Sequence, residues 1–101
     1  MSRHDERASE QVAHEAARWI LREAGSRSLI TVTRAEAHMR GDKIVVFVSV
    51  FPTEETRAAL AFLAHGRHDF SEHLKEHTRV RPLPTVDFAL DPELSGGPGG
   101  N

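Results

Sequence analysis

Two histidines of the sequence, His73 and His77, have a spacing that could hold a metal ion. Four residues apart in a predicted helix, they put two imidazoles on one helix face, an arrangement that can bind zinc or nickel. A zinc site needs three or four ligands, and the chain has no cysteine and no His-Glu-x-x-His motif. The pair also shares its helical stripe with Phe70 and Leu74, as half-buried histidines do. We therefore expect no metal site and no cofactor, and assign the histidines at most a gain of charge below about pH 6.5.

No other constellation of residues indicates catalysis. Ser49 lies in a predicted strand without the Gly-x-Ser-x-Gly motif that surrounds a nucleophile. The acid pair 54–55 is better explained as charge at the start of a helix, and the dipeptide at 68–69 has no partner ligands at useful spacing. We predict that the protein is not an enzyme. The Arg-Gly-Asp triplet at 40–42 is interpreted as a turn.

The composition bounds the size and the charge of the molecule. The chain has 101 residues with 13 basic and 15 acidic side chains, which fits one small domain of nearly balanced charge. Residues 82–101 contain three acids and no base, so the basic residues gather in the remainder. No segment approaches the roughly 18 apolar residues of a membrane span, and the first residues lack the apolar stretch of a signal peptide. We expect a soluble, cytoplasmic protein.

The first half of the chain predicts a helix followed by a β-hairpin. Ser9 is a candidate N-cap, and apolar residues at helical spacing predict a helix over 9–24 that Gly25 ends. Strands are predicted over 28–37 and 44–51, joined by a turn at Gly41-Asp42. The second strand is apolar on both faces, which favours a central place in the sheet. Strict alternation in the first strand would put Thr31, Thr33, Ala35 and Ala37 on one face and Ile30, Val32, Arg34 and Glu36 on the other.

The second half predicts two helices and a final strand. Thr53 is a candidate cap for a helix, and Gly66, or a position slightly later, breaks it from the next one. The alternating segment 85–91 predicts a half-buried strand, and 95–101 has the composition of a flexible tail. The buried side chains of these elements are expected to be Ala59, Leu60, Phe62, Leu63, Phe70, His73, Leu74, His77, Val86, Phe88 and Leu90.

This order, α-β-β-α-(kink)-α-β, predicts an α+β two-layer domain over 1–94, with a three-stranded sheet and its helices on one face. It is the order of a type II KH domain, in which a turn between two helices clamps nucleic-acid backbone. The break at 64–66 and the basic residues near it and in the hairpin are therefore our candidate RNA-binding site. Its members are Arg34, Arg40, Lys43, Ala64, His65, Gly66, Arg67, Lys75, Arg79 and Arg81.

Several short motifs in the right order resemble the ribosome-binding factor A family. The segment Thr31–Phe51, "TVTRAEAHMRGDKIVVFVSVF", aligns without gaps to that family's first hairpin, and "ILRE", "RVRPLP" and "DFALD" echo later elements. "AHG" looks like the Ala-x-Gly kink that replaces the usual KH loop in this family. The resemblance covers about residues 12–91.

The resemblance implies a KH-like protein that binds the small (30S) ribosomal subunit and its RNA, assists late 16S rRNA processing and is linked to cold adaptation. It implies neither catalysis nor a cofactor. The acids Asp87, Asp91 and Glu93 are expected to lie away from RNA, and the free protein is expected to be a monomer. Two alternatives stay open: a divergent KH-like module that binds another RNA or a protein partner, and a small histidine metal protein.

Overall fold

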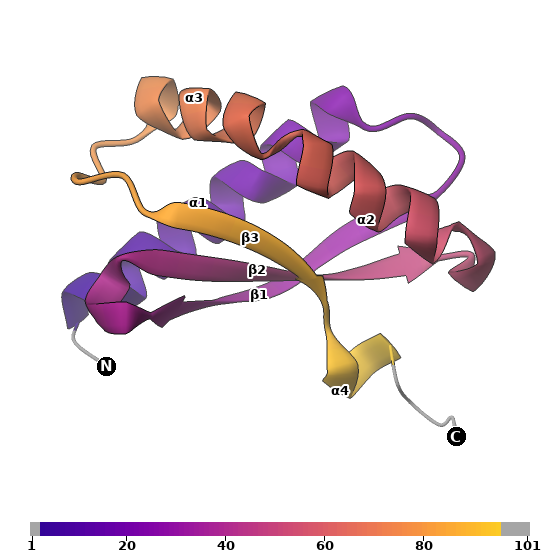
Figure 1. Cartoon of the computed structure of the whole chain (residues 1–101), viewed down its shortest axis with the longest axis horizontal. Coiled ribbons are helices and arrows are strands. Elements are labelled where there is room, and N and C mark those ends of the chain that lie inside the picture. The colour runs from indigo at the N-terminus through magenta and orange to yellow at the C-terminus, as the bar shows by residue number, and fades with distance from the viewer. Residues whose placement is uncertain (1–2, 96–101) are drawn as a thin grey trace.

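The computed structural model describes residues 3–95 and shows three strands packed against three helices (Figure 1). The order and the architecture confirm the predicted α+β fold. In Figure 1, α2 and α3 lie above the strands, and the short α4 lies below them. The helices are α1 (Arg3–Glu23), α2 (Thr56–His65), α3 (Arg67–His77) and α4 (Pro92–Ser95), and the strands are β1 (Leu29–His38), β2 (Lys43–Phe51) and β3 (Thr85–Leu90).

Strand β2 is the centre of the sheet, as its apolar sequence predicts. It pairs antiparallel with β1 and parallel with β3. Its inward side chains Ile44, Val46, Val48 and Val50 are buried, and the alternate residues are half-buried or exposed on the face away from the helices. Full burial of one such aliphatic side chain stabilises the fold by about 1.5–3 kcal/mol, so this row is a main contributor to the core.

A β-bulge in β1 changes which residues face the core. The pairing with β2 shifts between Val32 and Arg34, so that Thr33 is the extra residue. Ile30 and Val32 pack on the core before the bulge, and Ala35 and Ala37 pack on it after the bulge. The strict alternation expected for this strand is therefore wrong, because one inserted residue exchanges the two faces downstream.

Helix α1 begins earlier than predicted, at Arg3 rather than near Ser9. Ser9 is buried inside the helix, where its hydroxyl donates to the carbonyl oxygen of Asp5 at 2.9 Å, so it is not an N-cap. The polar residues before it belong to the first turns of the helix. The C-terminal end near Gly25 agrees with the prediction.

The connection after β2 also differs from the prediction. A 3-10 turn, Thr53–Glu55, precedes α2, and neither that turn nor α2 has a side-chain cap, so Thr53 does not cap the helix. The chain breaks between α2 and α3 at Gly66, as expected. After β3 comes the unpredicted helix α4, which contains Ser95, the first residue of the predicted tail. The rest of that tail, 96–101, lies outside the described residues.

Gly66 is required at the break because of what lies beside it. A Cβ atom at this position would be 2.5 Å from Cη2 of the buried Trp19 ring. The backbone of Gly66 is not strained, with φ of −88°, so the constraint is the close approach of the indole. The kink is therefore part of the core packing.

We expect Gly66→Ala to lower the free energy of unfolding by about 1–3 kcal/mol, the usual cost of an overpacked core. Gly25→Ala is the matched control, since no atom lies within 4 Å of its Cβ position, and it should be neutral or slightly stabilising. Urea denaturation of the two variants measures both effects. Equal stability of the two variants would contradict the packing role of Gly66.

Candidate nucleic-acid interface

The structure divides the ten predicted RNA-binding residues among four places. One group extends from the hairpin turn along the chain between α3 and β3 to the end of α3, and a second surrounds Asp87. A third is the kink itself, and Arg34 stands apart on the open face of the sheet. They do not form one continuous cluster of free cations. The four places differ in whether their basic side chains are paired with acids.

The first group is the turn-end surface, defined as Arg40, Lys75, Arg79 and Arg81. Arg40 and Arg81 line one groove where the β1–β2 turn meets the chain leading into β3. Arg40 lies in that turn with a left-handed φ of 59°. Arg40, Lys75 and Arg79 are exposed, and within residues 3–95 none of them forms an ion pair. These three cations can neutralise phosphate groups without first breaking a contact.

Arg81 is different, because its guanidinium is held by backbone carbonyl groups. It donates to the carbonyl oxygens of Lys75 at 3.0 Å and of Val80 at 2.7 Å. The Lys75 carbonyl belongs to the last turn of α3, where helix carbonyls need partners and positive charge is favourable. Arg81 therefore ties the α3–β3 connection to the end of α3.

Asp87 occupies the centre of the second group. Its carboxylate meets Lys43 Nζ at 2.9 Å and Arg67 Nη1 at 2.5 Å, which joins β2, β3 and the first turn of α3. The hydrogen bond from Lys43, and then that from Arg67, holds the pKa of Asp87 below its ordinary value of 3.8. Asp87 thus lies among the predicted RNA-binding bases, and its position away from RNA stays a prediction. The single negative charge of Asp87 offsets part of the positive charge of Lys43 and Arg67.

The kink exposes some of its residues and buries others. Ala64 and His65 are exposed at the end of α2, whereas Gly66 is half-buried and its Cα faces Trp19. The Gly66 N–H is already bonded to the carbonyl oxygens of Phe62 at 3.0 Å and Leu63 at 3.2 Å. That N–H is therefore not free to hold a ligand, contrary to what the KH comparison suggests.

Arg34 lies on the open face of β1 with several partners. Its guanidinium sits 4.1 Å from the Phe47 ring centroid, pairs with Glu36, and has Nε 3.4 Å from Asp91 Oδ2. These contacts hold the guanidinium against the sheet. The Arg34 side chain therefore lies along the open face of the sheet and does not extend into solvent.

Asp91 is buried, with 2 % of its surface exposed. The Thr33 hydroxyl donates to its Oδ2 at 2.6 Å, and the Glu93 N–H donates to its Oδ1 at 2.9 Å. The Thr33 bond foremost, together with those from Glu93 and Arg34, holds the pKa of Asp91 below 3.8 although burial acts to raise it. Asp91 thus ties the end of β3 to the bulge of β1 beside Arg34, and its position away from RNA stays a prediction.

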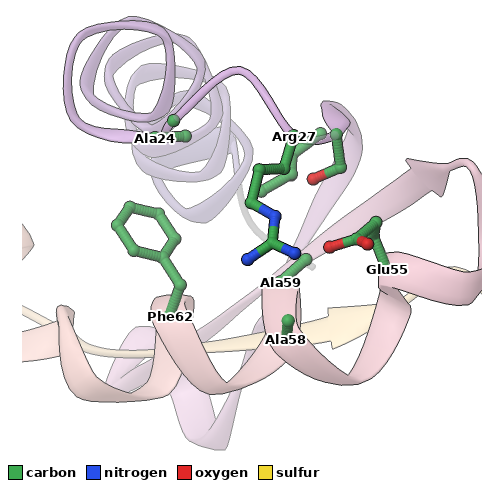
Figure 2. A pocket seen from close by; sticks show the side chains of 9 residues that line it. Ala24, Arg27, Glu55, Ala58, Ala59 and Phe62 are labelled. Carbon is green, nitrogen blue, oxygen red and sulfur yellow. The ribbon is translucent and has the colours of Figure 1, made fainter.

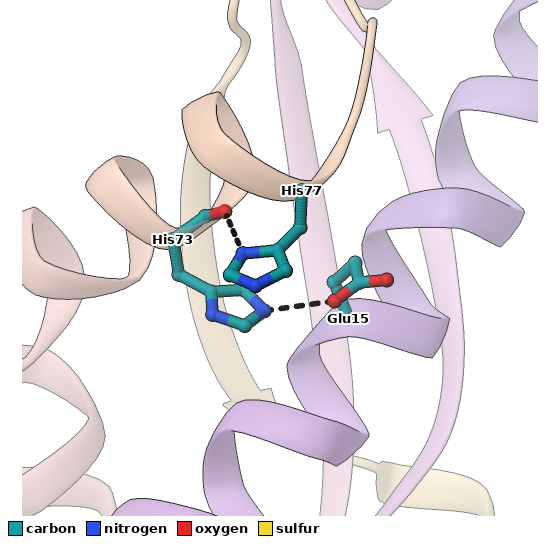
Figure 3. Close-up of side chains that lie close together, drawn as sticks. All are labelled: Glu15, His73 and His77. Carbon is teal, nitrogen blue, oxygen red and sulfur yellow. Dashed lines mark hydrogen bonds and ion pairs between the residues drawn. The ribbon is translucent and has the colours of Figure 1, made fainter.

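The histidine pair is joined by an acid that the sequence reading did not single out. His73 Nε2 lies 2.8 Å from Glu15 Oε1, and the His73 and His77 rings stack with centroids 4.0 Å apart (Figure 3). His73 is buried as predicted, but His77 is exposed. Helical spacing brings the histidines together, whereas the contact of α1 with α3 that adds Glu15 depends on tertiary packing.

A shallow groove lies between the end of α1 and the start of α2. Figure 2 shows the Arg27 side chain extending toward Glu55, with the Phe62 ring on another side. The two alanines Ala58 and Ala59 line its floor. None of the predicted site residues lines this groove.

In the described part of the chain no helix is long and apolar enough to cross a membrane.

Solved structures of two similar proteins share this fold. Ribosome-binding factor A from Thermus thermophilus matches with a TM-score of 0.72 and 26% identity over 83% of this chain and 91% of that one. A model of the same factor, fitted into an electron-microscopy map of a 30S–ribosome-binding factor A complex, matches with a TM-score of 0.72 and 26% identity over 84% and 92%. A Thermotoga maritima protein described as a candidate ribosome binding factor A shares the fold with a TM-score of 0.66 and 20% identity over 81% of each chain.

The structural likeness confirms the resemblance to the ribosome-binding factor A family that the sequence indicates. No protein-family model and no curated protein sequence matches the chain.

We expect Asp91→Asn to lower the melting temperature at pH 7, because the amide is a weaker acceptor for Thr33 and Arg34. Since the folded-state pKa of Asp91 is depressed, its ionised form stabilises the fold above pH 3.8, and this stabilisation is lost as the pH falls through the lower folded-state pKa. The difference between wild type and variant should therefore narrow in acid. Thermal melts from pH 7 to pH 3 measure it, with Glu54→Gln as an exposed control. A difference independent of pH would contradict the assignment.

Proposed function

We propose, from the structural likeness to ribosome-binding factor A, that this chain is a ribosome assembly factor that binds the small ribosomal subunit. The observation that carries the proposal is the match over about nine-tenths of the Thermus protein, which includes the structure fitted into the 30S complex. Its role would be late maturation of 16S rRNA, with a link to cold adaptation. It would act in the cytoplasm as a monomer before it meets the subunit.

The turn-end surface is the part of the chain best suited to contact RNA. Arg40, Lys75 and Arg79 are exposed and unpaired within the described residues, so phosphate binding costs no existing ion pair. Arg81 fixes the backbone of this surface through its bonds to α3. Contacts with phosphate groups supply affinity by releasing counterions, and a surface of fixed shape adds selectivity for folded RNA.

Lys43 and Arg67 play a secondary part in this proposal. Both are held by Asp87, whose lowered pKa keeps it ionised at neutral pH. They set the position of the kink relative to the sheet. The exposed Ala64 and His65 add a small surface beside them that RNA can approach closely.

The mechanism we propose involves no catalysis and no cofactor. The interface acts by charge and shape: it binds a particular conformation of the subunit and leaves when that conformation changes. Ser49 lies near the end of β2 opposite Thr31, which is not a base. Its position therefore supports a role in the sheet.

A second candidate is a divergent KH-like module that binds another RNA or a protein partner. The observation in its favour is the balance of charge over the sheet and the start of α3. There the bases Lys43, Arg67 and Arg34 are matched by the acids Asp87, Asp91 and Glu36. Such a surface has little excess positive charge. The two candidates differ in whether small subunits are preferred over unrelated structured RNA.

We expect the wild-type protein to co-sediment with isolated small subunits, with an affinity that falls steeply as salt increases. Replacing Arg40 and Arg79 together with alanine should weaken binding and reduce the slope of log K against log salt by about 2, if each side chain contacts one phosphate. Both residues are exposed, so the variant should fold.

Arg57→Ala is the matched control, because Arg57 is exposed on α2, away from the turn-end surface. It should leave the salt slope unchanged. Equal affinity for small subunits and for an unrelated folded RNA would favour the second candidate. Absence of any binding to subunits at low salt would refute the assembly-factor proposal.

A further inference from the structure

Glu15, His73 and His77 form the one group of three metal-ligating side chains within the described residues. Their nearest ligand atoms all lie within 4.8 Å of one another. Glu15 comes from α1 and the histidines from the last two turns of α3, so the group bridges two helices (Figure 3). Glu15 and His73 are buried, whereas His77 is exposed.

The hydrogen bonds fix how each imidazole is presented. Among the described residues, His77 Nδ1 is hydrogen-bonded to the His73 carbonyl oxygen at 2.9 Å. A carbonyl oxygen can only accept, so Nδ1 carries the proton. The Nε2 lone pair of His77 is then free on the other side of the ring. A histidine that donates one N–H to a backbone carbonyl and offers its other nitrogen is the usual arrangement of a metal ligand.

His73 is held in the complementary tautomer. Arg22 Nη2 lies 3.4 Å from His73 Nδ1, and because a guanidinium can only donate, Nδ1 accepts and Nε2–H donates to Glu15. A metal ion at Nε2 would replace this proton, which would move to Nδ1. Arg22 can then withdraw toward Glu23, its existing partner at 2.9 Å.

We propose that Glu15, His73 and His77 bind a Zn²⁺ ion that links α1 to the C-terminal end of α3. Two imidazoles and one carboxylate are a ligand set that zinc accepts, with a further position left for water. His73 and His77 also fall in a His-x-x-Glu-His segment, a spacing in which two histidines hold zinc in other proteins. The site is independent of the proposed ribosome binding.

The rearrangement that zinc requires is small. Zinc bonds of about 2.0–2.1 Å place tetrahedral ligand atoms roughly 3.3 Å apart. The widest separation in the group must therefore shrink by up to about 1.5 Å, and His73 Nε2 and Glu15 Oε1, now 2.8 Å apart, must separate slightly. The exposed His77 can supply this movement by tilting out of its stack on His73. The site opens to a groove that His14, Gln11 and Thr78 also line, which gives water and the ion access to it.

The test uses the full-length chain without a histidine tag, treated with EDTA and dialysed into metal-free buffer at pH 7.5. Titration with Zn²⁺ against a chromophoric competitor should show one tight site per chain. His77→Ala should weaken that site at least tenfold, and Glu15→Gln should weaken it while keeping a hydrogen-bond acceptor for His73. Zinc should raise the melting temperature of the wild type but not of His77→Ala.

His68→Ala is the matched control, since His68 is an exposed histidine of the same helix outside the group. It should bind zinc as tightly as the wild type does. Because His77 is exposed, loss of binding in its variant is not caused by a damaged core, which a urea melt without metal verifies. The proposal is overturned if the wild type binds less than one zinc ion, or if His77→Ala and His68→Ala bind equally.

Discussion

The indole of Trp19 is the contact on which the arrangement of the helices depends. It lies in the interior with 1 % of its surface exposed and stacks on Phe62 of α2 and Phe88 of β3, with Phe70 of α3 tilted against it. Its Nε1–H donates to Asp69 Oδ2 at 3.0 Å, so the ring's polar atom is satisfied at the start of α3. The Trp19 side chain of α1 thereby contacts α2, α3 and β3.

Because the indole lies against Gly66, the angle between α2 and α3 is set from inside the protein. The charged groups outside follow from that angle. Arg67 is the first residue of α3, and its ion pair with Asp87 places the kink over β3. Lys43 of β2 pairs with the same carboxylate. Arg67, beside the kink, therefore has a structural role. Lys75 and Arg79, toward the other end of α3 and just after it, form no ion pair within the described residues.

The sequence predicted the layers of the fold because they depend on local patterns. The apolar run 44–51, the break at Gly66 and the alternating strand 85–91 each carry their own signal, and β2, the kink and β3 lie where these signals indicate. The bulge at Thr33 could not be predicted in this way, since no glycine or proline marks it and its partner Asp91 is distant in the sequence. The start of α1 was misplaced because Ser9 has a common capping residue type but is buried within the helix.

The candidate site was predicted only in its residue types. The basic residue types of Arg34, Lys43 and Arg67 correctly indicate cations at the surface. The sequence does not show that these cations pair with acids, which are Glu36, Asp87 and Asp91. Glu15 was missed for the same reason: its partner is 58 positions away. Pairings across such separations are properties of the packed molecule.

The bulge divides β1 into two segments that differ in which residues face outward. Upstream of Thr33 the odd-numbered residues face outward, and downstream of it the even-numbered ones do. A regular ladder that kept Thr33 would turn one half of the strand over, which would carry Arg34 and Glu36 inward or Ile30 and Val32 outward. Deleting Thr33 would instead leave each of these side chains on its present face. The effect of a substitution in β1 therefore depends on which side of Thr33 it lies, since an odd-numbered position faces outward before the bulge and toward the core after it.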